Sequence, residues 1–162
     1  MSDLHTIRLH VNGQPQGGAV PPRLHLLDWL RDELGLKGSH LGCEHGVCGA
    51  CTVEVDGRIV RGCLTLAVQA DGAQVRTVEG LSELPDARLL QQAFVKHNAL
   101  QCGFCTPGML MAARELVQHK PDATREEVRE WMSGNYCRCT GYHAIVDAVC
   151  DVLAQRHQEA AA

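Results

Sequence analysis

Hydrophobic and polar positions along this chain of 162 residues change their period about halfway. In the first half, four short runs have the alternation or the composition of β-strands: residues 6–11, 52–55, 58–61 and 74–78. Two dipeptides that follow such runs, Asn12-Gly13 and Asp56-Gly57, are strong turn signals. Leucines at helical spacing from Leu26 to Leu34 predict one helix, which Gly35 is well placed to end.

From about Asp86 onward the apolar residues recur every three to four positions, which predicts helices. Four are expected, the first marked by Leu89, Leu90, Ala93 and Phe94 and the others opening at Thr106, Thr124 and Thr140. Thr106 is expected to be an N-cap with Pro107 at the first helical position. Thr124 begins a capping box that Glu127 completes.

The change of period predicts an α+β domain over residues 1–78, a linker over 79–85 and an all-helical domain over 86–162. With 45% hydrophobic and 21% charged residues, the chain can build a core. A net charge of −4, scattered basic residues and only 4% aromatic residues give no reason to expect a nucleic acid as partner. No apolar run approaches the roughly 18 residues that cross a bilayer, so no membrane span is expected.

The cysteine content is the unusual feature of the composition, because nine cysteines in 162 residues is far above ordinary usage. The first residues carry neither a secretion signal nor a twin-arginine signal, which favours a cytoplasmic location. In the cytoplasm thiols stay reduced, and an odd number of cysteines cannot all pair in disulfides. Metal binding is therefore the expected use of these cysteines.

Four cysteines of the first half form the pattern C-x4-C-x2-C-x11-C: Cys43, Cys48, Cys51 and Cys63. The first three have the spacing of plant-type [2Fe–2S] ferredoxins. Three glycines in or beside the loop allow its backbone to approach an anionic cluster closely: Gly42, Gly46 and Gly49. Structural zinc is the alternative, although zinc favours two C-x2-C pairs and only one is present here. His45 is expected to be an exposed loop residue, because a Rieske centre needs a second histidine ligand.

Four cysteines of the second half form the pattern C-x2-C-x31-C-x-C: Cys102, Cys105, Cys137 and Cys139. Each pair precedes an expected helix, and the partial positive charge of two helix N-termini would stabilise thiolates and an anionic cluster. This set alone fits zinc as well as iron and sulfide, and its place beside the first set favours a second cluster. Cys150 is left over and is expected to be a small buried core residue.

Three segments around these cysteines, residues 41–53, 101–108 and 135–142, resemble the iron–sulfur subunit of the xanthine oxidase family of molybdenum hydroxylases. The likeness runs from about His5 to Leu153. It implies a ferredoxin-like (β-grasp) first domain and a four-helix-bundle second domain, each with a [2Fe–2S] cluster on its four cysteines. It also implies that Gln101 contacts a molybdopterin held by a separate large subunit.

The resemblance further implies a relay of electrons from the molybdopterin, through the two clusters one electron at a time, to FAD or another acceptor. The FAD is expected on a medium subunit, and the substrate chemistry on the large subunit, so no catalytic residue is expected in this chain. The sequence leaves open an aldehyde, an N-heterocycle, carbon monoxide or an aromatic acyl-CoA as substrate, and NAD, a quinone, a cytochrome or oxygen as final acceptor. The competing functions are a free ferredoxin, which needs only the first half, and a zinc-stabilised interaction module.

Overall fold

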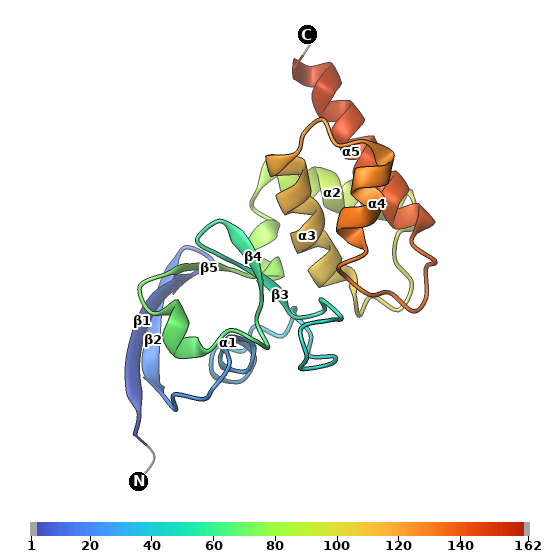
Figure 1. Cartoon of the computed structure of the whole chain (residues 1–162). Helices are drawn as coiled ribbons and strands as arrows, with labels where there is room; N and C mark the ends of the chain where they lie inside the picture. Colours follow the sequence, from blue (N-terminus) through green and yellow to red (C-terminus); the bar gives the residue numbers. More distant parts are fainter. Residues whose placement is uncertain (1–2, 161–162) are drawn as a thin grey trace.

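The computed structural model describes residues 3–160, in which a sheet-containing part is followed by a helical part (Figure 1). The five strands are β1 (His5–Val11), β2 (Gln14–Val20), β3 (Thr52–Val55), β4 (Arg58–Arg61) and β5 (Gln74–Arg76). The helices are α1 (Leu26–Asp28), α2 (Pro85–Lys96), α3 (Thr106–His119), α4 (Arg125–Met132) and α5 (His143–Ala160). The predicted α+β class is confirmed. Within residues 3–160, no helix has the length and the apolarity that crossing a bilayer requires.

The sheet is mixed, with strand order β2-β1-β5-β3-β4. β1 and β2 form a hairpin whose turn is the predicted one at Asn12-Gly13, and both turn residues have positive φ, as a type I′ turn requires. β5 pairs in parallel with β1 and antiparallel with β3, so it joins the first hairpin to the second. The apolar side of the sheet packs on the α1 segment, and together they form the first hydrophobic core.

Three elements in or beside the sheet differ from the sequence prediction. β2 was not expected, because its residues Gln14 to Ala19 are all exposed and show no alternation. β5 ends at Arg76 rather than at Val78, because Val78 is the first residue of a 3₁₀ helix (Val78–Leu81). The helix from Leu26 is α-helical only to Asp28 and continues as one π-helical turn (Trp29–Glu33) before Gly35, which has φ 70°.

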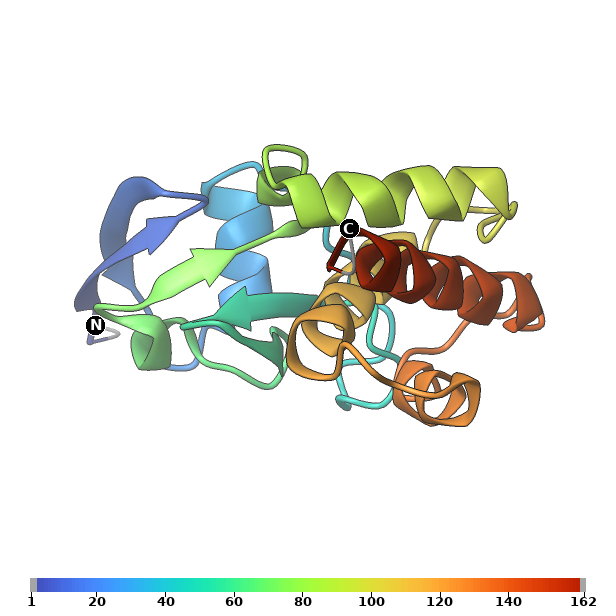
Figure 2. The same cartoon turned by 90° about the horizontal axis from the view of Figure 1, so that it is seen from above.

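The helices α2 to α5 pack around a second hydrophobic core (Figure 2). The capping box of α4 is formed as predicted, with the Thr124 hydroxyl accepting from Glu127 N–H and the Glu127 carboxylate accepting from Thr124 N–H. Thr106 is not the N-cap of α3, because the carbonyl of Cys105 already accepts from Met109 N–H and places Thr106 inside the helix. α5 begins at His143 rather than at Thr140.

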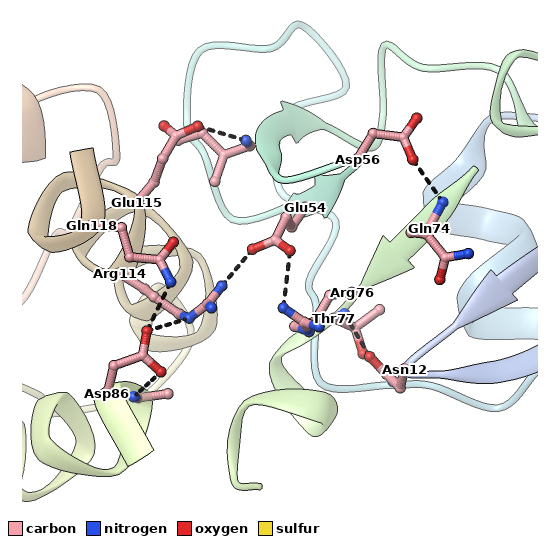
Figure 3. Close-up of polar contacts among 12 residues, drawn as sticks. Asn12, Glu54, Asp56, Gln74, Arg76, Thr77, Asp86, Arg114, Glu115 and Gln118 are labelled. Carbon is pink, nitrogen blue, oxygen red and sulfur yellow. Dashed lines mark hydrogen bonds and ion pairs between the residues drawn. The ribbon is translucent and has the colours of Figure 1, made fainter. Parts of the chain in front are cut away.

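Helix α3 connects the two parts of the molecule, because it packs on α2 and α4 and also lies against β3 and β4. A polar network ties this helix to the sheet (Figure 3). Arg114 donates to the carboxylates of Glu54 on β3 and of Asp86 on α2, at 2.5 and 3.0 Å. Glu115 accepts from the Ile59 backbone N–H on β4 at 2.9 Å. Both parts are therefore held in one arrangement by specific contacts as well as by apolar packing.

Candidate metal centres

The first cysteine set lies on the long loop between the α1 segment and β3 and on the turn that follows β4. The backbone of this loop takes left-handed φ values at Glu44, Gly46 and Gly49, which turn it sharply around the cysteines. His45 is exposed, as expected, and its backbone N–H points at the Cys43 sulfur, 3.4 Å away. The expected loop, tight and lined by N–H groups, is present.

The glycines of this loop leave room beside the sulfurs. A Cβ atom at Gly42 would lie 3.1 Å from the Cys48 sulfur. A Cβ atom at Gly46 would clash with the Leu64 side chain, and one at Gly49 with the amide of Asn135. Gly42 therefore lets the backbone pass close to the Cys48 sulfur, and Gly46 and Gly49, both with positive φ, let the loop pack tightly on its neighbours, which fits an inorganic cluster lying close to the backbone.

The second cysteine set joins the start of α3 to the segment between α4 and α5. Cys137 accepts from the Thr140 hydroxyl at 3.1 Å and from the Thr140 N–H at 3.4 Å. This use of Thr140, together with left-handed backbone at Gly141 and Tyr142, explains why α5 begins later than expected. The buried hydroxyl of Thr106, the residue after Cys105, has no hydrogen-bond partner among residues 3–160, which is consistent with a group bound at this site that supplies one.

The sulfurs of each set meet in pairs. In the first set Cys51 and Cys63 are 3.3 Å apart, and Cys43 and Cys48 contact each other. In the second set Cys102 and Cys139 are 3.6 Å apart, and Cys105 and Cys137 contact each other. Among residues 3–160, no group of three or more His, Cys, Asp or Glu side chains is compact enough for a single metal ion. Pairs of thiolates suit two irons bridged by sulfide better than one zinc with four ligands.

One pair of each set lies deeper than the other: Cys51 and Cys63 are both buried in the first set, and Cys105 is buried with Cys137 partly exposed in the second. Burial raises the pKa of Cys51 to about 11 and that of Cys105 to about 12, so negative charge at these sulfurs requires a metal to compensate it. The hydrogen bond from the His45 backbone N–H, with further N–H groups of the loop, lowers the pKa of Cys43 to about 6. Burial acts to raise the pKa of Cys137, but the hydrogen bonds from Thr140 outweigh it and lower the pKa.

The two cysteine loops touch each other directly. The backbone N–H of Tyr136 donates to the carbonyl of Cys48 at 2.8 Å, and the buried amide of Asn135 donates to the carbonyl of Gly49 at 3.1 Å. Gly108 on α3 packs so closely on that same carbonyl that a Cβ atom would clash with it. Sequence reasoning found no role for Asn135, because its partner lies 86 positions earlier in the chain.

Exposed apolar side chains gather around both sets. Val47 and Leu64 flank the first set and are more than half exposed. Phe104 and Tyr136 flank the second set and line, with its four cysteines, an open hollow of about 590 Å³. Gln101 is exposed beside Cys102. A larger hollow of about 610 Å³ between α4 and α5 includes none of the eight paired cysteines. Apolar rims of this kind mark surfaces that contact other molecules.

Comparison with known proteins supports a metal centre in each half. Residues 9–82 match the family model described as "2Fe-2S iron-sulfur cluster binding domain", and residues 77–150 match "[2Fe-2S] binding domain". The chain is 56% identical to the nicotine 6-hydroxylase small subunit of Paenarthrobacter nicotinovorans over 156 residues, which cover 95% of this chain and 93% of that one. The chain belongs to the iron–sulfur subunits of the molybdenum hydroxylases.

Solved structures place this iron–sulfur subunit in the same family. A chain of quinoline 2-oxidoreductase from Pseudomonas putida 86 superposes with a TM-score of 0.90 at 52% identity, covering 98% of both chains. Aldehyde oxidoreductase from Desulfovibrio gigas matches with a TM-score of 0.86 at 44% identity over 96% of this chain, but over only 17% of its own longer chain. The iron–sulfur subunit carries two [2Fe–2S] clusters and transfers electrons within a heteromeric oxidoreductase whose large subunit holds the molybdopterin.

Proposed function

We propose that the eight paired cysteines are the cluster ligands and that each contacting pair binds one iron. The first cluster would take Cys43 with Cys48 on one iron and Cys51 with Cys63 on the other. The second cluster would take Cys102 with Cys139 and Cys105 with Cys137. The observation that carries this assignment is the pairwise contact of the sulfurs.

The second cluster is the entry point for electrons in this proposal. Its exposed pair, Cys102 and Cys139, lies beside exposed Gln101 and the apolar rim of Phe104 and Tyr136. We propose that the molybdopterin subunit docks on this rim and that Gln101 hydrogen-bonds the pterin. A polar side chain within an otherwise apolar contact surface would orient the cofactor against the exposed iron.

The first cluster is the exit point. Cys43 and Cys48 are partly exposed, and the apolar side chains of Val47 and Leu64 stand beside them. We propose that a medium subunit with FAD docks here and takes the electrons one at a time.

We keep the division at residues 1–78, 79–85 and 86–162 and the four-helix-bundle form of the helical domain as part of the proposal. We also keep the expected cytoplasmic location as part of the proposal.

An N-heterocycle is the substrate class that we propose for the complex. The small subunit of nicotine 6-hydroxylase and the matching chain of quinoline 2-oxidoreductase are 56% and 52% identical to this chain, and the matching segment of the aldehyde oxidoreductase is 44% identical. The assay is anaerobic mixing of the purified complex with an N-heterocycle or with an aldehyde, followed by the bleaching of cluster absorbance. Bleaching by the aldehyde alone would contradict this proposal and leave the ligand assignment unaffected.

The ligand assignment is tested by chemical analysis and EPR. We expect about four irons and four acid-labile sulfides per chain and two distinct EPR signals on reduction, since the two ligand sets have different surroundings. Replacing Cys48 by Ser should remove or alter one signal, and replacing Cys137 by Ser should remove or alter the other. Zinc without labile sulfide would refute the assignment, and so would a single EPR species integrating to one spin per chain.

A further inference from the structure

The guanidinium of Arg61 lies where the two cysteine loops meet. Its Nε donates to the carbonyl of Gly46 in the loop of the first set, at 3.2 Å. One Nη donates to the carbonyl of Gly134, just before the last cysteines of the second set, at 2.6 Å, and the other Nη donates to the Thr52 hydroxyl at 2.5 Å. A single side chain therefore binds three segments that lead directly into cluster ligands.

Within residues 3–160, the positive charge of this side chain has no carboxylate among the contacts it makes. A fourth contact, to the amide oxygen of Asn135 at 3.4 Å, is also to a neutral oxygen. Arginine stays protonated in proteins, so the charge is permanent. These contacts orient the guanidinium without neutralising its charge. The charge can therefore change the electrostatic potential at neighbouring groups.

The shortest links from this guanidinium to cluster ligands run to the first set. Its partner Thr52 directly follows Cys51, and its partner Gly46 precedes Cys48 by two residues. On the other side, Gly134 and the more distant contact Asn135 lie three and two residues before Cys137. The electrostatic effect of the guanidinium should therefore fall mainly on the first cluster.

We propose that Arg61 is a positioning residue that also raises the reduction potential of the first cluster relative to the second; this rests on the ligand assignment under Proposed function. A [2Fe–2S] cluster becomes more negative by one charge on reduction, so a nearby cation stabilises the reduced form more than the oxidised form. In the transfer step one electron leaves the reduced second cluster and enters the oxidised first cluster, with no proton or bond exchanged. Arg61 shifts this equilibrium toward the first cluster, which is the proposed exit.

The experiment is a redox titration of the assembled complex, followed by the EPR signals of the two reduced clusters. Replacing Arg61 by Gln should raise the ratio of oxidised to reduced first cluster about tenfold at a fixed potential, which is 59 mV for a one-electron couple. The second cluster should change less. Arg61→Lys keeps the charge and should keep most of the wild-type potential. Arg58→Gln is the matched control, because it removes a cation from the same strand at a position whose side chain is 69% exposed.

The outcomes separate the charge of Arg61 from its hydrogen bonds. Unchanged potentials in Arg61→Gln would overturn the proposal, and so would an Arg61→Lys variant that shifts as far as Arg61→Gln. If Arg61→Gln does not retain the first cluster, Arg61→Lys alone decides the question. A first-cluster potential near wild type in Arg61→Lys supports the charge role, and a tenfold rise in the ratio of oxidised to reduced first cluster refutes it. Failure of the ligand assignment itself would appear in the wild type, as an iron content other than four or as zinc.

Discussion

Arg114→Met tests the polar network that fastens helix α3 to the sheet. The Arg114 side chain is only 9% exposed and donates one hydrogen bond to Glu54 and one to Asp86 (Figure 3). Methionine has a similar length and keeps the apolar part of the packing, but it cannot donate. The substitution therefore removes the charge and both hydrogen bonds while leaving most of the volume in place.

The expected cost follows from those two contacts. A hydrogen bond to a charged group is worth about 1.5–3 kcal/mol, and breaking a fully buried ion pair costs about 3–5 kcal/mol. Here each carboxylate keeps another partner, Arg76 for Glu54 and Gln118 for Asp86, so neither is left isolated. We expect a destabilisation of about 2–4 kcal/mol, which for a chain of this size lowers the unfolding midpoint by roughly 4–16 °C.

The assay uses the EPR signals of the two [2Fe–2S] clusters in the complex, because these clusters belong to this subunit. Samples are heated for a fixed time at a series of temperatures, reduced, and integrated for remaining spins. Arg58→Met is the control: Arg58 contacts Glu115 at 3.5 Å across the same interface, but its exposure limits the contact to about 0.2–1 kcal/mol. Equal midpoints for the two variants would refute the view that the buried network, rather than apolar packing alone, fixes the two parts together.

Three further substitutions, the first with a matched control variant, have distinct expected outcomes. Gly108→Ala should destabilise the chain by about 1–3 kcal/mol, because its methyl group clashes with the Gly49 carbonyl, and Gly18→Ala, where nothing lies within 4 Å, should be nearly neutral in the same heating assay. Cys150→Ala should leave iron and sulfide content intact, since this thiol is partly buried against the helical core and contacts no other cysteine in the described pairs; a loss of iron would show that the ligand set is wrong. Gln101→Ala should slow the bleaching of cluster absorbance by substrate in stopped-flow measurements without changing cluster number or spectra, whereas bleaching at the wild-type rate would exclude a functional pterin contact.

Local patterns in the sequence were sufficient for much of the fold. The alternation in β1, the turn at Asn12-Gly13 and the capping box at Thr124 each depend on residues close together in the chain, and each is present. β2 was missed because an exposed strand with two consecutive glycines has no apolar alternation, and only its pairing with β1 makes it a strand. The π-helical turn after Asp28 likewise has no periodic signal.

The same contrast between local and distant residues applies to the two cysteine sites. Spacing and resemblance predicted which cysteines belong together, and the structure brings each set of four to one place. The contacts between the helical part and the sheet-containing part could not be predicted, because they join distant positions in the chain. Arg114 donates to Glu54 across 60 residues, and Asn135 donates to Gly49 across 86. Neither pair has a local pattern, and the roles of both depend on the way the helical part packs on the sheet.

The exposure of Cys102 and Cys139 has a consequence for how the enzyme is assembled in time. A cluster with two ligands at the surface can be delivered to the folded subunit from outside, because a protein that donates clusters could reach it. In the docking arrangement proposed above, the molybdopterin subunit covers that surface and would close the route. The second cluster would then have to be inserted before the large subunit docks, and a subunit waiting for its partner would hold a cluster that oxygen and chelators can also reach. The proposed docking thus implies an order of cluster insertion and assembly, set by which pair of thiols faces outward.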